Sequence, residues 1–170
     1  EIYAKILAPY VHHLIVFDIH SSIAAACLAQ HFSKVTFHYP FEIPREYLPE
    51  PIEEINGIIV PDKGAVERAS LVAAHLYGNC PVIQCEKIRD FGSGNILGFA
   101  MDPLPYAGNY LVVDDICDGG WTFNELAAAF ARDSHFKGST LHLYISHGIF
   151  SKGLGNISPI YDSITCTDSF

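Results

Sequence analysis

Two adjacent aspartates, Asp114 and Asp115, follow the short apolar run 111–113. A glycine turn comes next, and after it an apolar helical pattern runs from residue 123 to residue 132. A glycine turn that leads into a helix points free backbone N–H groups at one spot, which favours a bound phosphate. Two neighbouring carboxylates suit sugar hydroxyls or a hydrated Mg²⁺. The pattern therefore indicates a phosphate site beside two acids that could bind either a sugar or a metal ion. The residues of this turn are Asp118, Gly119, Gly120, Trp121 and Thr122.

The start of the helix after this turn can be predicted from two residues. Thr122 and Glu125 have the spacing of a capping box, so we expect the helix to begin at Thr122. The alternative interpretation is an ordinary strand, turn and capped helix without a ligand. Two adjacent acids at a strand end are costly to place without a partner, which weighs against that alternative.

A second strand-to-helix loop has residues suited to an anion. It follows the apolar run 57–60 and consists of Asp62, Lys63, Gly64 and Ala65. Gly64 lets the backbone approach an anion, and the N–H groups at the helix start can bind it. An Asx turn without a ligand is the alternative. Further along this helix, we interpret Arg68 as a structural salt-bridge partner rather than a substrate ligand.

A basic pair, Lys87 and Arg89, follows the predicted strand 81–85. The glycine-containing stretch 91–95 comes next, and its composition predicts a mobile loop. Two cations on such a loop can close over phosphates and stabilise the charge that develops during transfer. Nearer the amino terminus, Asp18 and His20 follow another apolar run and precede a predicted helix. An N-terminal helix cap with a surface histidine is the plainer interpretation of His20.

Alternating strand and helix patterns place these residues in one fold class. They predict an α/β fold with a mostly parallel sheet flanked by helices, built from right-handed βαβ units. Ligands of such sheets lie beyond the carboxyl ends of the strands. The residues expected at or just after strand ends are Asp18, His20, Asp62, Lys87, Arg89, Asp114 and Asp115. The expected helices are 1–10, 23–32, 66–76 and 123–132, and the expected strands are 14–17, 35–38, 57–60, 81–85, 96–100, 111–113, 140–145 and 164–167.

The composition of the chain restricts the classes of protein to which it can belong. The chain has 170 residues, is 49% hydrophobic and carries a net charge of −9, which predicts a folded core and argues against a nucleic-acid surface. No apolar run approaches transmembrane length, and no signal peptide is visible. The five cysteines are an odd number without CxxC spacing, as expected for reduced thiols. Four prolines between residues 39 and 51 predict a boundary that separates domain 1–40 from domain 41–170.

Several of these motifs together resemble a known family. They resemble those of ribose-phosphate diphosphokinases (PRPP synthetases), which have a type I phosphoribosyltransferase-like, Rossmann-like fold. The resemblance implies transfer of diphosphate from ATP to ribose 5-phosphate, giving PRPP and AMP. It covers the end of the family's first domain and most of its second. The motifs are Asp18-Ile-His20-Ser21, Pro61 to Ala65 with Arg68-Ala69, Lys87-Ile-Arg89, the stretch 110–122, and Ser146-His147-Gly148-Ile149-Phe150-Ser151.

The resemblance also implies a role for each residue. Asp114 and Asp115 would hold the ribose hydroxyls, and residues 118–122 would hold the 5-phosphate. The loop 62–65 would hold pyrophosphate, and His20 and Asp62 would contact the cofactor Mg²⁺. Lys87 and Arg89 would stabilise the transition state. The implied partners are ATP and ribose 5-phosphate in a cytoplasmic homo-oligomer, with no nucleic acid and no membrane.

Two residues differ from the family pattern, and two other functions remain as alternative interpretations. Trp121 stands where many relatives carry Gly, and Gly119 stands where they often carry Thr, which affects the geometry of the loop. A type I phosphoribosyltransferase acting on a nucleobase would share the central loop, but we find no base-binding hood. A non-catalytic, PRPP synthetase-like regulatory subunit is the third interpretation. The chain starts at Glu1 and matches only the C-terminal part of the family, so we expect a fragment that is inactive in isolation.

Overall fold

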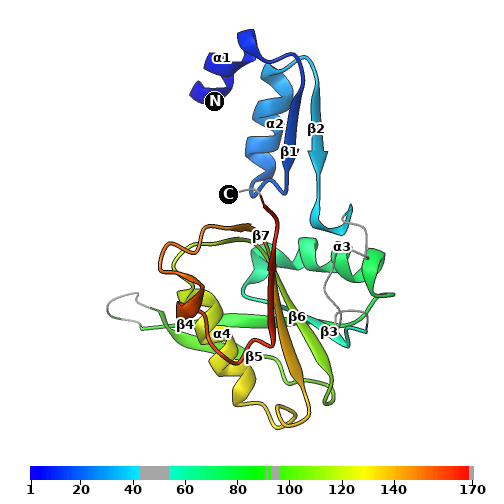
Figure 1. The fold of residues 1–170 in the computed structure, drawn as a ribbon, viewed down its shortest axis with the longest axis vertical. Coiled ribbons are helices and arrows are strands. Elements are labelled where there is room, and N and C mark those ends of the chain that lie inside the picture. The colour runs from blue at the N-terminus through cyan, green and yellow to red at the C-terminus, as the bar shows by residue number, and fades with distance from the viewer. Residues whose placement is uncertain (43–53, 91, 93–95, 169–170) are drawn as a thin grey trace. The chain divides into compact units, whose positions relative to one another are not determined.

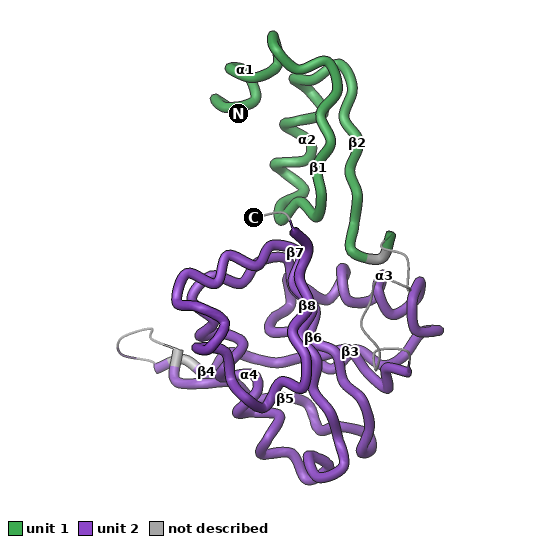
Figure 2. The backbone as a smooth tube through the Cα atoms, in the orientation of Figure 1, with its two compact units in different colours: residues 1–43 green, residues 44–170 purple. Residues whose placement is uncertain are grey.

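The computed structural model describes residues 1–42, 54–90, 92 and 96–168. The chain forms two compact units, Glu1–Ile43 (unit 1) and Pro44–Phe170 (unit 2), which are coloured separately in Figure 2. The predicted domain boundary after residue 40 stays a prediction. Among the described residues, no helix is both long and apolar enough to span a membrane.

Unit 1 is a small βαβ arrangement. Strands β1 and β2 pair in parallel, and helix α2 connects them. The hydroxyl of Ser21 caps α2 by accepting a hydrogen bond from the backbone N–H of Ala24 at 3.4 Å. Its elements are α1 (Ile2–Leu7), η1 (Ala8–Tyr10), β1 (Leu14–Phe17), α2 (Ser22–His31), β2 (Val35–His38) and η2 (Pro40–Glu42).

Unit 2 contains a six-stranded sheet in the order β5-β4-β3-β6-β7-β8 (Figure 1). All neighbouring strands are parallel except β4 and β5, which form an antiparallel pair at one edge. The predicted α/β class with a mostly parallel sheet is therefore confirmed. The strands are β3 (Gly57–Val60), β4 (Val82–Arg89), β5 (Ile96–Met101), β6 (Asn109–Cys117), β7 (Thr140–Gly148) and β8 (Ser163–Cys166).

Helices cover both faces of this sheet. Helix α3 (Val66–Leu76) packs on β3, β4 and β6, and α4 (Trp121–Ala131) packs on β5. Strand β3 is apolar and fully buried, and β6 is so from Tyr110 to Val113, as is typical of parallel strands with helices on both sides. One hydrophobic cluster joins α4 to alternate residues of the strands, including Ile59, Tyr110 and Val112. Short 3₁₀ turns η4 (Lys63–Ala65) and η5 (Leu154–Asn156) complete the unit.

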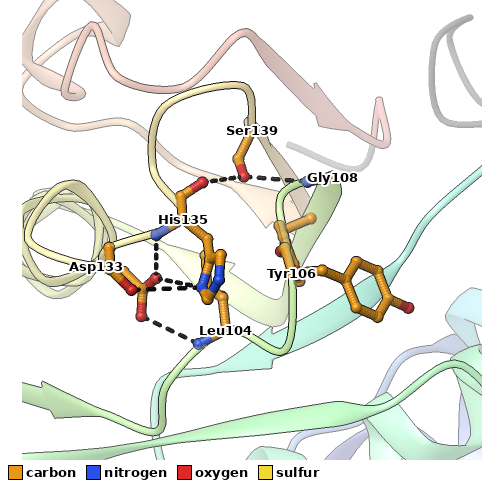
Figure 3. A network of polar contacts seen from close by, with 8 residues as sticks. Leu104, Tyr106, Gly108, Asp133, His135 and Ser139 are labelled. Carbon is orange, nitrogen blue, oxygen red and sulfur yellow. Dashed lines mark hydrogen bonds and ion pairs between the residues drawn. The ribbon is translucent and has the colours of Figure 1, made fainter.

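A polar network fixes the connections at the amino ends of β6 and β7 (Figure 3). The carboxylate of Asp133 accepts hydrogen bonds from the backbone N–H of Leu104 at 3.0 Å and of His135 at 2.7 Å. The hydroxyl of Ser139 donates to the carbonyl of His135 and accepts from the N–H of Gly108 at 3.1 Å. These bonds link the turn after α4 to the segment that leads into β6. They lie at the end of the sheet where β6 and β7 begin, whereas the acid pair lies at the end where β6 stops.

Two predicted boundaries near the acid pair are wrong. β6 continues to Cys117, so Asp114 and Asp115 lie within the strand rather than after it. The reason is that β6 keeps pairing with β7 as far as Gly148. Helix α4 begins at Trp121 rather than Thr122, because Gly120 takes a left-handed conformation, with φ of +78°, and serves as the N-cap.

Candidate phosphate and sugar site

The carboxyl ends of three neighbouring parallel strands bring most of the predicted site residues of unit 2 to one edge of the sheet. Asp62 follows β3, Lys87 lies in the last part of β4, and Asp114 and Asp115 lie in the last part of β6. β3 is paired with both β4 and β6, so these residues come from adjacent strands. Polar residues at such an edge are placed to meet a common ligand.

Asp62 and Lys87 form an ion pair, with Nζ of Lys87 at 2.9 Å from Oδ2 of Asp62. The other carboxylate oxygen accepts a hydrogen bond from the N–H of Gly64 at 3.0 Å, which shapes the loop as an Asx turn. Partial burial acts to raise the pKa of Asp62, but the hydrogen bond and charge of Lys87 outweigh it. The pKa of Asp62 is therefore lowered, and the carboxylate is ionised at neutral pH.

A cavity of about 430 Å³ adjoins this ion pair. Its lining combines the loop after β3 with the middle and end of β4. Burial and the charge of Asp102 raise the pKa of the Cys85 thiol to about 12. The thiol therefore lines the cavity in its neutral form and is not a nucleophile. The lining residues are Asp62, Lys63, Gly64, Gln84, Cys85, Glu86 and Lys87.

The guanidinium of Arg68 lies against both members of the acid pair. Its two terminal nitrogens are 3.7 Å from Oδ1 of Asp114 and 3.8 Å from Oδ2 of Asp115. The three side chains are mostly buried, with exposures of 14% for Arg68, 19% for Asp114 and 5% for Asp115. The expected salt-bridge role of Arg68 is thus observed, and its partners are the two acids predicted to bind sugar.

The pKa of Asp114 is raised to about 7. Burial is the largest cause, and the carboxylate of Asp115 adds to it, while the N–H of Asp115 and the charge of Arg68 act in the opposite direction. Asp114 is therefore partly protonated near neutral pH. Hydroxyl groups that donate hydrogen bonds to this carboxylate would favour its ionised form.

The glycine turn joins the end of β6 to the start of α4. Gly120 needs its positive φ, and a Cβ there would lie 2.4 Å from Cδ1 of Ile157. The N-cap residue Gly120 has no side chain to cap α4, so among the described residues the backbone N–H groups of the first turn have no side-chain cap and can meet another acceptor. Trp121 is 43% exposed beside this turn, and its ring lies 6.3 Å from that of Phe99.

The segment after β7 braces this turn. Asn156 donates a hydrogen bond from Nδ2 to the carbonyl of Gly119 at 3.1 Å. Asn124, in the first turn of α4, donates to the carbonyl of Asn156 at 2.8 Å and accepts from the N–H of Ser158 at 2.7 Å. Sequence reasoning missed this bracing and the nearby Lys152, whose stem lies along Gly119. No local motif points to these contacts, because they depend on how the chain turns after β7.

For two predicted site residues, His20 and Arg89, a place in this site stays a prediction. His20 belongs to unit 1, so its joint metal contact with Asp62 stays a prediction. The backbone of Arg89 ends β4, but its side chain lies outside the described residues, as do residues 91 and 93–95 of the predicted loop. Within the described ranges, no three or more His, Cys, Asp or Glu side chains are grouped closely enough to hold a metal ion.

Comparison with known proteins finds a relative in sequence and similar folds among solved structures. The chain is 29% identical to a ribose-phosphate pyrophosphokinase of Pyrococcus abyssi over 167 residues, which are 97% of this chain and 55% of that protein. Its fold matches phosphoribosylpyrophosphate synthetase from Mycobacterium smegmatis with a TM-score of 0.65 and 16% identity, covering 98% of this chain and 59% of that one. No protein-family model matches the chain.

The chain thus spans just over half the length of these two proteins. The resemblance found in its motifs extends over nearly all of its residues. In sequence the chain is similar to a ribose-phosphate pyrophosphokinase, and in fold it is similar to phosphoribosylpyrophosphate synthetase.

Proposed function

We propose that this chain is part of a ribose-phosphate diphosphokinase, which transfers diphosphate from ATP to ribose 5-phosphate and yields PRPP and AMP. The similarity to a ribose-phosphate pyrophosphokinase over 97% of the chain supports this proposal. The observation that carries it is the acid pair, Asp114 and Asp115, held by Arg68 directly before a glycine turn and an uncapped helix start.

In this proposal, ribose 5-phosphate lies across the end of β6. Its hydroxyls donate hydrogen bonds to Asp114 and Asp115, and its 5-phosphate accepts bonds from the N–H groups of residues 118–122. Arg68 keeps the two acids together and reduces their mutual repulsion. The uncapped start of α4 supports the phosphate assignment, because the N–H groups there need an acceptor.

The cavity beside Asp62 and Lys87 is our candidate for the diphosphate. The oxygen of the C1 hydroxyl attacks the β-phosphorus of ATP, the bond from that phosphorus to the α–β bridging oxygen breaks, and AMP leaves. The hydroxyl proton is released. Residues 62–65 would hold the diphosphate, and Lys87 with Arg89 would offset the charge that develops during transfer. Such reactions require positioning and charge compensation rather than a covalent nucleophile.

Mg²⁺ is the cofactor that we propose. Asp62 fits it, because its pKa is lowered and its carboxylate is ionised. Both oxygens of Asp62 already accept hydrogen bonds, yet a carboxylate has further lone pairs for a metal or its water. Mg²⁺ is commonly held by one or two carboxylates and the substrate phosphates, so a large protein cage is not needed. His20 would be the second protein contact, and the bound ion would neutralise phosphate charge.

The test is a product assay on the complete gene product. ATP, ribose 5-phosphate and Mg²⁺ are incubated with the protein, and the products are separated by chromatography. Equal amounts of PRPP and AMP are expected. Pyrophosphate release from PRPP and a nucleobase would show a phosphoribosyltransferase instead. Binding of ribose 5-phosphate without any product would favour the non-catalytic subunit. A homo-oligomeric state, which the same resemblance implies, can be measured on this material by light scattering.

A further inference from the structure

Lys152 lies beside the glycine turn, although it is 33 positions away from Gly119 along the chain. It belongs to a tight turn after β7, in which the N–H of Gly153 donates to the carbonyl of Phe150 at 2.7 Å. Both residues have positive φ, +46° for Phe150 and +78° for Gly153. This turn directs the Lys152 side chain back onto the turn that precedes α4.

The contact between Lys152 and Gly119 is close along the whole end of the lysine side chain. A Cβ built on Gly119 would lie 3.6 Å from Cε, 3.8 Å from Cδ and 3.9 Å from Nζ of Lys152. These are ordinary van der Waals distances, so the aliphatic stem lies along the glycine backbone while the ammonium remains accessible. Lys152 itself is exposed.

Lys152 differs from the other described cations near this edge of the sheet. Lys63 pairs with Glu86, Arg68 with the acid pair and Lys87 with Asp62. Lys152 forms no ion pair with any residue that the structure describes, although the protein carries a net charge of −9. An accessible ammonium therefore lies against the turn that we assign to a phosphate group.

The charge balance of the turn calls for such a cation. A phosphate monoester carries about −1.5 to −2 charges at pH 7. The start of a helix offers only about half a positive charge. Asp118 is exposed in the same turn, and Asp114 and Asp115 come just before it, so nearby carboxylates repel the phosphate. The backbone N–H groups alone leave most of the phosphate charge uncompensated.

We propose that Lys152 is a further binding residue for the 5-phosphate, with its ammonium contacting the phosphate oxygens over Gly119. This inference rests on the proposed function, because the ligand is the sugar phosphate of that reaction. Lys152 is expected to contribute to affinity rather than to the chemical step, since the 5-phosphate does not react.

The test compares lysine variants by isothermal titration calorimetry with ribose 5-phosphate at low salt. Lys152→Gln and Lys152→Met should each weaken binding by about tenfold, as expected for loss of one exposed charge-assisted contact. Lys152→Met keeps an aliphatic side chain against Gly119, so this variant separates the contribution of the charge to affinity from that of packing. Lys152→Arg should retain most of the affinity. Lys137→Gln, an exposed lysine in the turn before β7 at the opposite sheet edge, is the matched control and should bind like the unaltered chain.

Salt dependence gives a second readout that a purely structural role would not change. Raising the salt concentration should weaken binding less in Lys152→Gln than in the unaltered chain, because one charge pair is missing. Unchanged affinity in folded Lys152→Gln, or full affinity in Lys152→Met, would overturn the role of Lys152 alone. If the unaltered chain does not bind ribose 5-phosphate, the proposed function itself fails.

Discussion

Lys87 and Asp62 lie 2.9 Å apart, although 25 positions separate them along the chain. Their contact joins the end of β4 to the loop after β3 and places a cation and an acid in one cavity wall. Both side chains are partly exposed, 25% for Lys87 and 46% for Asp62, so water and ligands can reach them. A phosphate entering the cavity would compete with Asp62 for the lysine, and a bound metal would compete with the lysine for Asp62.

Lys87→Ala should lower turnover in the complete gene product far more than it raises the Michaelis constant. Its cation is needed mainly when charge develops during phosphoryl transfer, and loss of one such donor costs about 3–4 kcal/mol, or roughly 10²–10³ in rate. Steady-state kinetics with varied ribose 5-phosphate gives both constants. Lys137→Ala is the control, because this exposed lysine lies in the turn before β7 and does not line the candidate cavity, and its loss should leave turnover nearly normal. Near-normal turnover with a raised Michaelis constant in Lys87→Ala would assign the lysine to substrate binding.

Asp114 should make the protein less stable as pH rises. Its folded pKa of about 7 lies above the ordinary value of 3.8, so the folded state holds a proton that the unfolded state has lost. The contribution of Asp114 to stability is fully present below its ordinary pKa and is lost as pH rises through about 7. Asp114→Asn carries no titrating carboxyl and should lack this part of the pH dependence.

The measurement is urea unfolding of both proteins at several pH values between 4 and 8 (roughly the window set by these two pKa values). The stability of Asp114→Asn relative to the unaltered chain should rise steadily with pH. Asp62 titrates in both proteins and cancels in the comparison. A difference that does not change with pH would show that the pKa of Asp114 is not raised.

Gly120 should tolerate substitution poorly, and Gly119 should tolerate it well. Gly120→Ala forces a side chain into a left-handed conformation at φ of +78°, at a cost of roughly 1–2 kcal/mol, and its Cβ would also meet Ile157. In Gly119→Ala the new Cβ would have ordinary contacts with Lys152. Urea unfolding of both variants measures the difference. The double variant Gly120→Ala with Ile157→Ala should stay destabilised, because the strain is in the backbone, and full recovery would refute that cause.

Gly120→Val should in addition weaken ribose 5-phosphate binding, because a branched side chain at the turn obstructs the approach of the phosphate to the backbone. The variant has to be shown folded by circular dichroism before titration. Unchanged affinity in a folded Gly120→Val protein would exclude this turn as the phosphate site.

Apolar runs made the fold class predictable, whereas strand lengths depended on pairing. The runs at 57–60 and 111–113 are strands because only strands of a covered parallel sheet bury so many β-branched residues in succession. Local patterns did not show that β6 extends through Asp114 to Cys117, because its partner β7 decides where pairing stops. The capping pattern of Thr122 and Glu125 was also misleading, since the backbone conformation of Gly120 set the start of α4.

The candidate site was predictable in its residue types but not in its contacts. Acids and cations near the carboxyl ends of strands were recognisable because these ends lie side by side in a parallel sheet. The partners of Arg68 and Lys87 come from other elements of the fold, and sequence spacing carries no information about such pairs. No sequence pattern indicated that Lys152 lies at the site. Its position depends on a turn in which Phe150 has a positive φ, a conformation that phenylalanine rarely adopts.

Binding of the sugar of ribose 5-phosphate by Asp114 and Asp115 is the central feature of the proposed function. Calorimetric titration of ribose 5-phosphate into the unaltered chain and into Asp114→Asn/Asp115→Asn tests it directly, with unfolding measured in parallel. We predict binding to the unaltered chain and at least about tenfold weaker binding to the variant, as expected for loss of hydrogen bonds to charged groups. The variant should remain folded, with a moderate loss of stability because Arg68 loses its charged partners. Equal affinity in both proteins would contradict the claim, and a variant that no longer folds would show that the acid pair is structural.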